Sequence, residues 1–331
     1  MKSRKIKLLV VGIFFVAFFS FFWGTKANCE ENKFPTKPIE IIVNYPAGGP
    51  TDVPTRIVVD ELSTELGVPI SIQYKPGAAG MIGATFVSTQ KADGHTFLST
   101  SISSIVSAPL LGKTSAYDPL KDFTPIASFV VIPNLLLIHS SSELDSFDAV
   151  VEYAKKNPGD LTCSTPGAGT TAHFVIEVLK MHGVDIVPVP SKGGAGAATA
   201  LLGKHVDMGV FLYSAAIPHV KSGALRMLAA TEKVAQEPEV PTLKEKGYPE
   251  AEGLGAIMGF VGPANMPKAV TDRIAEATQK VLQIPSIIQA LEKVGYTILY
   301  IDPDGLTNKF AEDYKSIDKI VKAAGLGKYA K

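Results

Sequence analysis

Cysteine, tryptophan and metal-binding patterns are scarce in this chain of 331 residues. It has two cysteines and one tryptophan, and its six histidines occur singly, with no His-x-x-x-His pair. Two cysteines cannot build a disulfide framework, and scattered histidines do not favour a zinc site. Lys plus Arg equals Asp plus Glu at 32 each, so no basic excess favours nucleic acid. We therefore expect no bound metal and no nucleic-acid partner.

Motifs of nucleotide-binding enzymes and serine hydrolases are also missing. The Gly203-Lys204 pair is preceded by Ala198, where a phosphate-binding loop of the Walker type requires glycine. The Gly194–Gly196 run is followed by Thr199 instead of the third glycine of a dinucleotide fingerprint, and no G-x-S-x-G occurs. The loops hold few acid–base side chains, which favours a binding protein without a cofactor over an enzyme.

The balanced charge hides an unusual amino-terminal segment. Residues 1–27 contain five basic and no acidic side chains, and the run from Leu8 to Trp23 is apolar. Sixteen residues are short for a membrane span, which needs about 20, but they fit a secretory signal peptide. We expect cleavage near Ala27; acylation of Cys29 and retention as an anchor stay open. In each case the rest of the chain, with 27 basic against 32 acidic side chains, lies in the periplasm or otherwise outside the cytoplasm.

The remaining sequence alternates short β-branched runs with longer helical patterns, which is typical of α/β folds with parallel strands. Strands are expected at residues 38–45, 70–74, 96–100, 161–163, 185–189 and 206–212. Helices are expected at residues 51–66, 170–182, 195–202, 267–282, 285–294 and 303–324, with another that ends near Gln90.

Two long apolar runs predict that the chain crosses between two sheets. Ile126–His139 is too long for one ordinary strand, and Pro133 interrupts it, so we interpret it as a strand that leaves one sheet and enters another. Gly255–Gly262 would cross back. The prediction is a discontinuous first lobe, residues 34–127 plus 257–331, and an inserted second lobe, residues 128–256.

Glycine and hydroxyl residues recur at the carboxyl ends of the expected strands, just before helices begin. Ligands bind at this edge of open α/β sheets. Helix starts offer unpaired backbone N–H groups and about half a positive charge, and glycine allows the backbone to approach a ligand closely. Because such loops occur in two groups, we expect a cleft between two lobes that binds an anion.

Three polar sites in these loops have structural explanations that we prefer to catalytic ones. Cys163 is expected to be a small buried residue at a strand end. His173, in the first turn of a helix, is expected to pack or cap. Asp52 and Arg56 are spaced by four residues, which predicts a local surface ion pair.

Several motifs in order resemble the extracytoplasmic solute receptors of tripartite tricarboxylate transporters, often called Bug receptors. The similarity runs from Phe34 to Gly325. The matching motifs are Tyr45–Gly49 with Asp52 and Arg56, Lys75–Gly83, Asp93–Phe97, Lys192-Gly193, Gly203 with Val206-Asp207, and Val240–Thr242.

The resemblance implies a two-lobed α/β fold of the type II periplasmic-binding kind, with two parallel-rich sheets flanked by helices and joined by crossover strands. Such a receptor would hold a mono-, di- or tricarboxylate, largely through backbone N–H groups, and deliver it as a monomer to a two-component membrane permease. The implied ligand-binding residues are Ala47, Gly48, Gly49, Asp52, Ser99, Thr100 and Ser101 in the first lobe, and Ser164, Thr165, Gly169, Thr170, Lys192 and Gly193 in the second. Gly49, at the loop tip, is expected to adopt a positive φ.

The sequence departs from the family pattern at three places. Ser191 and Gly196 replace a common Tyr and Pro, and Phe211 replaces a common Asp. If Phe211 faces the cleft, it selects against ligands that carry an amine; a core position is the alternative. Two other functions stay open: a sensor that presents its closed form to a membrane kinase, and a secreted hydrolase on the same fold.

Overall fold

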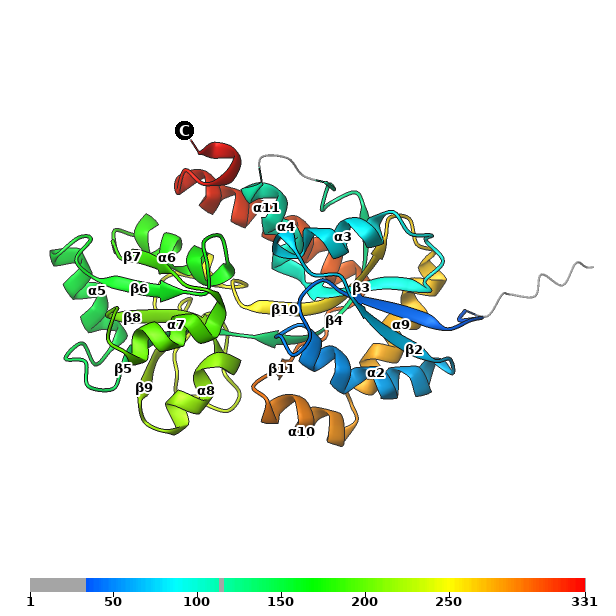
Figure 1. The fold of residues 1–331 in the computed structure, drawn as a ribbon, viewed down its shortest axis with the longest axis horizontal. Coiled ribbons are helices and arrows are strands. Elements are labelled where there is room, and N and C mark those ends of the chain that lie inside the picture. Colours follow the sequence, from blue (N-terminus) through cyan, green and yellow to red (C-terminus); the bar gives the residue numbers. More distant parts are fainter. Residues whose placement is uncertain (1–33, 113–115, 331) are drawn as a thin grey trace, which may run out of the picture.

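The computed structural model describes residues 34–112 and 116–330. These residues form two lobes side by side, each a sheet flanked by helices (Figure 1). The expected signal peptide, its cleavage near Ala27 and the acylation of Cys29 lie outside the described residues. No helix in the described part of the chain is both long and apolar enough to cross a membrane.

The first lobe contains a six-stranded sheet in the order β11-β4-β10-β3-β1-β2. Its strands are β1 (Ile39–Val43), β2 (Ile70–Tyr74), β3 (Thr96–Ser101), β4 (Phe123–Ile132), β10 (Ala256–Pro263) and β11 (Thr297–Ile298). Its helices are α2 (Asp52–Leu66), α3 (Met81–Ser88), α4 (Ile102–Leu111), α9 (Lys268–Val281), α10 (Pro285–Lys293) and α11 (Pro303–Ala323), with short 3₁₀ turns at Ala78–Gly80 and Gly327–Tyr329.

The second lobe contains a five-stranded sheet in the order β7-β6-β8-β5-β9. Its strands are β5 (Asn134–His139), β6 (Thr162–Thr165), β7 (Val187–Pro190), β8 (Met208–Leu212) and β9 (Leu225–Ala230). Its helices are α5 (Phe147–Lys156), α6 (Thr171–Met181), α7 (Gly193–Leu202) and α8 (Tyr213–Lys221), with a 3₁₀ turn at Pro249–Ala251.

Both sheets are mixed, and most strands of each run in one direction, as expected. In the first sheet β1 is parallel to β2 and β3, but β10 runs antiparallel to β3 and β4. In the second sheet β6 is parallel to β7 and β8, but β5 runs antiparallel to β8 and β9. The reason is that β5 and β10 arrive from the opposite lobe and enter each sheet against the direction of its own strands.

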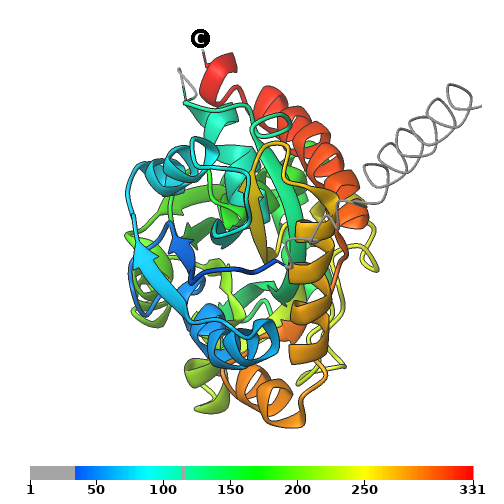
Figure 2. The same cartoon turned by 90° about the vertical axis from the view of Figure 1, so that its right-hand side faces the viewer.

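Helices cover both faces of the sheets (Figures 1 and 2). Alternating side chains along each strand therefore supply two core layers. In β1, Ile42 packs in the layer under α3, α4 and α11, whereas Ile41 packs in the layer under α2, α9 and α10. In β8, Val210 faces α5 and α6, whereas Phe211 faces α7 and α8. This period of two is the side-chain alternation of a strand covered on both faces.

The predicted crossovers are confirmed by the sheet memberships. β4 stays in the first sheet through Ile132, and β5 begins in the second sheet at Asn134. Pro133 between them has no N–H to donate to either ladder. After β9 the chain returns through residues 231–255 to β10 in the first sheet. The exact lobe limits, 34–127 plus 257–331 and 128–256, stay a prediction.

Candidate functional site

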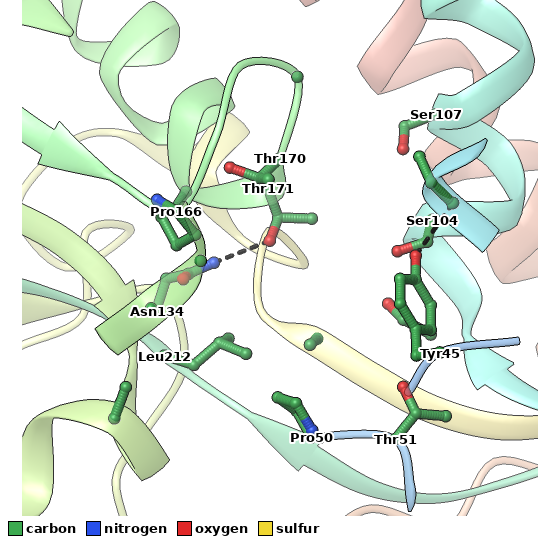
Figure 3. A pocket seen from close by; sticks show the side chains of 18 of the residues that line it. Tyr45, Pro50, Thr51, Ser104, Ser107, Asn134, Pro166, Thr170, Thr171 and Leu212 are labelled. Atoms are coloured by element: carbon green, nitrogen blue, oxygen red, sulfur yellow. Dashed lines mark hydrogen bonds between the residues drawn. The ribbon is translucent and has the colours of Figure 1, made fainter. Parts of the chain in front are cut away.

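A cavity of about 460 Å³ lies between the lobes and is lined by both of them (Figure 3). Figure 3 shows hydroxyl side chains of the first lobe, among them Ser104 and Tyr45, across from Asn134, Thr170 and Thr171 of the second. The rest of the wall is largely apolar, including Leu111, Leu212 and Met258. Among the described residues, no side chain with a formal charge lines this cavity.

Five helices begin on the wall of the cavity. Their N-cap or first residues are Thr51 for α2, Ser101 for α4, Thr170 for α6, Gly193 for α7 and Leu212 for α8. The first N–H groups of a helix have no partner within it, and its positive end favours an anion. The cavity is therefore electropositive through backbone dipoles rather than through lysine or arginine.

Tyr45 and Ser104 form the polar part of the first-lobe wall. The Tyr45 hydroxyl donates to the carbonyl oxygen of Ala79 at 3.1 Å. Burial raises the pKa of Tyr45, although a hydrogen bond with the Ser104 hydroxyl acts in the opposite direction. The phenol therefore keeps its proton at neutral pH and stays a neutral part of the wall.

The loop before α6 is fixed by its own hydrogen bonds. The Thr170 hydroxyl donates to the carbonyl oxygen of Gly167 (2.8 Å) and accepts from the N–H of His173 (3.3 Å), as an N-cap does. The His173 Nδ1 accepts the N–H of Gly169 at 2.8 Å, so the predicted capping role of His173 is confirmed. Gly169 has φ +75°, and a Cβ there would lie 2.4 Å from Leu111 Cδ1 in the other lobe.

Four of the predicted ligand-binding residues line the cavity. They are Ser101, Gly169, Thr170 and Gly193. The others lie near the wall but are not part of it: Ala47, Gly48 and Gly49 in the loop before Pro50, buried Ser99 and Thr100 in β3, buried Ser164 and Thr165 in β6, exposed Lys192 before Gly193, and Asp52 and Phe211.

Asp52 organises the β1–α2 loop from beneath. Its side chain is 1% exposed, and its carboxylate accepts hydrogen bonds from the N–H of Gly48 (2.6 Å), the Arg56 Nε (3.0 Å) and the Tyr74 hydroxyl (2.7 Å). Burial would raise the pKa of Asp52, but these bonds and the Arg56 charge together hold it below its ordinary value. The expected ion pair with Arg56 is present, with a buried carboxylate rather than two surface groups.

The positive φ of this loop belongs to Gly48 (φ +77°), which corrects the expectation for Gly49. In this left-handed conformation, which glycine adopts at no steric cost, the Gly48 N–H donates to the Asp52 carboxylate.

Phe211 is fully buried in the core layer under α7 and α8, and it does not line the cavity. The alternation along β8 directs the following residue, Leu212, to the cavity instead. The structure therefore places Phe211 in the core, the alternative that its sequence position left open. Cys163, likewise buried in β6, is a free cysteine whose pKa burial raises, so it is an inert thiol.

Several residues of the wall were not predicted from the sequence. They include Tyr45, Thr51, Ser104, Asn134, Thr171 and Leu212. The signal that could have found half of these six is position, because Thr51, Thr171 and Leu212 flank helix starts at the carboxyl ends of strands. No group of side chains suited to a metal ion occurs in residues 34–112 and 116–330.

Two sheets exchanging crossover strands, with a cavity of helix starts between them, define the fold of a periplasmic binding protein. Residues 55–326 match the model of the tripartite tricarboxylate transporter family receptor. The chain belongs to this family, which confirms the resemblance seen in its motifs. It is 31% identical to BugT of Bordetella pertussis over 324 residues, covering 96% of this chain and 97% of BugT.

Two solved structures extend the comparison. Rpa4515 of R. palustris, solved with adipate, matches with a TM-score of 0.75 at 27% identity. The match covers 89% of this chain and 99% of the Rpa4515 chain. MatC of Rhodopseudomonas palustris, solved with bound malate, has a TM-score of 0.70 at 27% identity and covers 87% of this chain and 100% of its own.

Proposed function

We propose that this protein is a periplasmic receptor that captures a small carboxylate between its lobes and delivers it to the membrane permease of a tripartite transporter. The observation that carries the proposal is the convergence of five helix starts on one cavity with no charged side chain among its described lining residues. Such a wall attracts an anion and offers it backbone donors. The adipate and malate bound by two similar receptors support the same ligand class.

Within this proposal the predicted contacts divide into two groups. Ser101, Gly169, Thr170 and Gly193 would touch the ligand directly, since they line the cavity. Ser99, Thr100, Ser164 and Thr165 would support the helix starts from the ends of β3 and β6, and Asp52 would hold the β1–α2 loop. The receptor would act as a monomer after export directed by residues 1–27.

The direct test is a thermal-shift panel on ligand-stripped protein. The panel contains succinate, malate, adipate, citrate, benzoate and hexanoate, each beside its amide. At 100 times its dissociation constant, a binding acid should stabilise the fold by about 2.7 kcal/mol. Its amide should bind at least roughly tenfold more weakly, because the helix starts favour an anion. Equal binding of acid and amide, or no shift with any acid, would contradict the proposal.

Delivery is tested separately, by uptake of the binding acid into cells. Deleting the receptor should abolish uptake, and a copy whose cavity is blocked should not restore it. Binding without any effect on uptake would point to a sensory role.

A further inference from the structure

Asn134 is the first residue of β5, next to the point where the chain passes from one sheet to the other, and its side chain is at the cavity (Figure 3). Its Nδ2 donates to the carbonyl oxygen of Leu254 at 2.7 Å and to the Thr171 Oγ1 at 2.9 Å. A carbonyl oxygen can only accept, so the amide nitrogen, with its two hydrogens, must be the atom on this side. The chemistry of its partners thus fixes which way the amide points.

The backbone of Asn134 is equally constrained. Its N–H donates to the Thr231 Oγ1 at 3.0 Å, and its carbonyl oxygen accepts the N–H of Thr231 at 3.0 Å. Thr231 and Leu254 both belong to the segment that returns from the second lobe to the first. Asn134 therefore joins the outgoing and the returning crossovers, and only 1% of it is exposed.

Thr171, the first residue of α6, receives the second amide hydrogen. A hydroxyl has one proton to donate. The Thr171 Oγ1 accepts from Asn134, and within residues 34–112 and 116–330 it donates to no group. Because Asn134 occupies an acceptor position, the proton is left for an acceptor inside the cavity, at the positive end of α6. A carboxylate only accepts hydrogen bonds, whereas an ammonium group only donates them.

We infer that Asn134 is a positioning residue that holds the Thr171 hydroxyl as a donor to the carboxylate of the ligand. This inference rests on the proposed function and names the subsite for the charged end of the ligand. The Asn134 Oδ1 is buried with no hydrogen-bond partner among the described residues, which is uncommon in folded proteins. The role of the Asn134 amide nitrogen in holding Thr171 explains why a side chain with an unpaired oxygen is buried at this position.

A double-mutant cycle separates positioning from a merely structural role. The variants are Thr171→Val, Asn134→Leu and the pair, and the probe is the panel acid that raises the wild-type melting temperature most. Each single change should weaken binding about tenfold by calorimetry. The double variant should also bind about tenfold more weakly, because Asn134 acts through a hydroxyl that is already gone. Multiplication of the two losses to about a hundredfold would overturn the inference, as would unchanged binding by Thr171→Val.

Thr278→Val is the matched control. The Thr278 hydroxyl is buried in α9, donates to the carbonyl oxygen of Ile274 at 2.8 Å and does not line the cavity. Its loss should lower the melting temperature and leave affinity unchanged. If Asn134→Leu does not fold, Asn134→Ala takes its place in the cycle. Absence of binding to the wild type would overturn the proposed function and this subsite together, whereas wild-type binding with multiplied losses overturns the subsite alone.

Discussion

The two lobes build their halves of the cavity by different means. In the first lobe, side chains hold the backbone: the buried Asp52 carboxylate receives donors from Gly48, Arg56 and Tyr74 and fixes the loop before α2. In the second lobe, the Thr170 hydroxyl and the His173 Nδ1 hold the loop before α6, and the backbone of the loops before α6 and α7 turns at Gly169 (φ +75°) and Gly193 (φ +79°). The first wall should therefore be sensitive to loss of a charge, and the second to gain of a side chain.

Gly169→Ala tests the second wall and should have the largest effect on binding. The added Cβ would lie 2.4 Å from Leu111 Cδ1 of the first lobe, so the Leu111 side chain, which lines the cavity, would have to shift for the lobes to keep their present approach. Calorimetry with the tightest panel acid should show a loss of roughly a hundredfold, about 2.7 kcal/mol.

Gly183→Ala is the control for Gly169→Ala. Gly183 has a similar φ of +78°, but a Cβ there has no atom within 4 Å. Both variants carry backbone strain of roughly 1–3 kcal/mol, so both should melt earlier. Only Gly169→Ala should lose affinity, and equal affinity losses would refute the cross-lobe contact.

Asp52→Asn tests the first wall. Removing the charge weakens three hydrogen bonds to a buried acceptor, and we expect a loss of stability of about 2 kcal/mol with a severalfold loss of affinity. The folded pKa of Asp52 is lowered, so its contribution is present above the unfolded pKa and is lost as pH falls through the folded pKa. Acid unfolding followed by circular dichroism should therefore begin at different pH values in the wild type and in Asp52→Asn. The same starting pH in both would mean that this carboxylate contributes nothing to stability.

Glu232→Gln tests the junction between the lobes and should have the smallest effect on ligand binding. The Glu232 carboxylate, in the returning segment, accepts the N–H groups of Gly253 (3.1 Å) and Gly255 (2.9 Å) and the Thr231 hydroxyl. It faces a second cavity, whose other charged lining residues are Glu252, Lys309, Glu312 and Asp313. Lys309 and Asp313 of α11 form an ion pair with each other. Burial raises the pKa of Glu232 to about 7, against the lowering effect of these donors and of Lys309.

The sign of the pH effect follows from linkage. Between pH 4.5 and about 7, the Glu232 carboxyl keeps its proton in the folded state and has lost it in the unfolded state. The stability that Glu232 contributes is therefore full at acid pH and declines across this interval. Glu232→Gln removes the decline. Chemical unfolding should be measured at about pH 5 and about pH 8. Between these two pH values, the free energy of unfolding of the variant should rise relative to that of the wild type by on the order of 2 kcal/mol. A difference independent of pH would mean that Glu232 keeps its charge throughout.

Much of the fold could be predicted from sequence because its signals are local. β2 matches its predicted range of residues 70–74, and Pro133 within an overlong apolar run marked the exchange between sheets. Helix α4 was missed because Ser101, Ser103 and Ser104 favour turns and caps in isolation, whereas burial of Ile102, Ile105 and Val106 against the sheet makes the segment helical.

The site was harder to predict because its wall is assembled across the lobes. Asn134 looks like a polar residue after a proline, and only the fold brings it within 2.9 Å of the Thr171 hydroxyl. Phe211 and Leu212 are adjacent apolar residues, and the strand register decides which one faces the cavity. A family motif locates a loop, but which of its atoms face the ligand depends on packing that the motif does not record.

The central place of β10 in the first sheet has a consequence for the order of folding. β10 lies between β3 and β4, and its partner in the register Met258↔Ser101 is 157 residues earlier in the chain. Until this strand is available, β3 and β4 have open edges and the first lobe cannot close its core, whereas all five strands of the second lobe precede it. Contacts so distant in sequence form slowly. The first lobe thus stays incompletely folded until the last quarter of the chain has arrived.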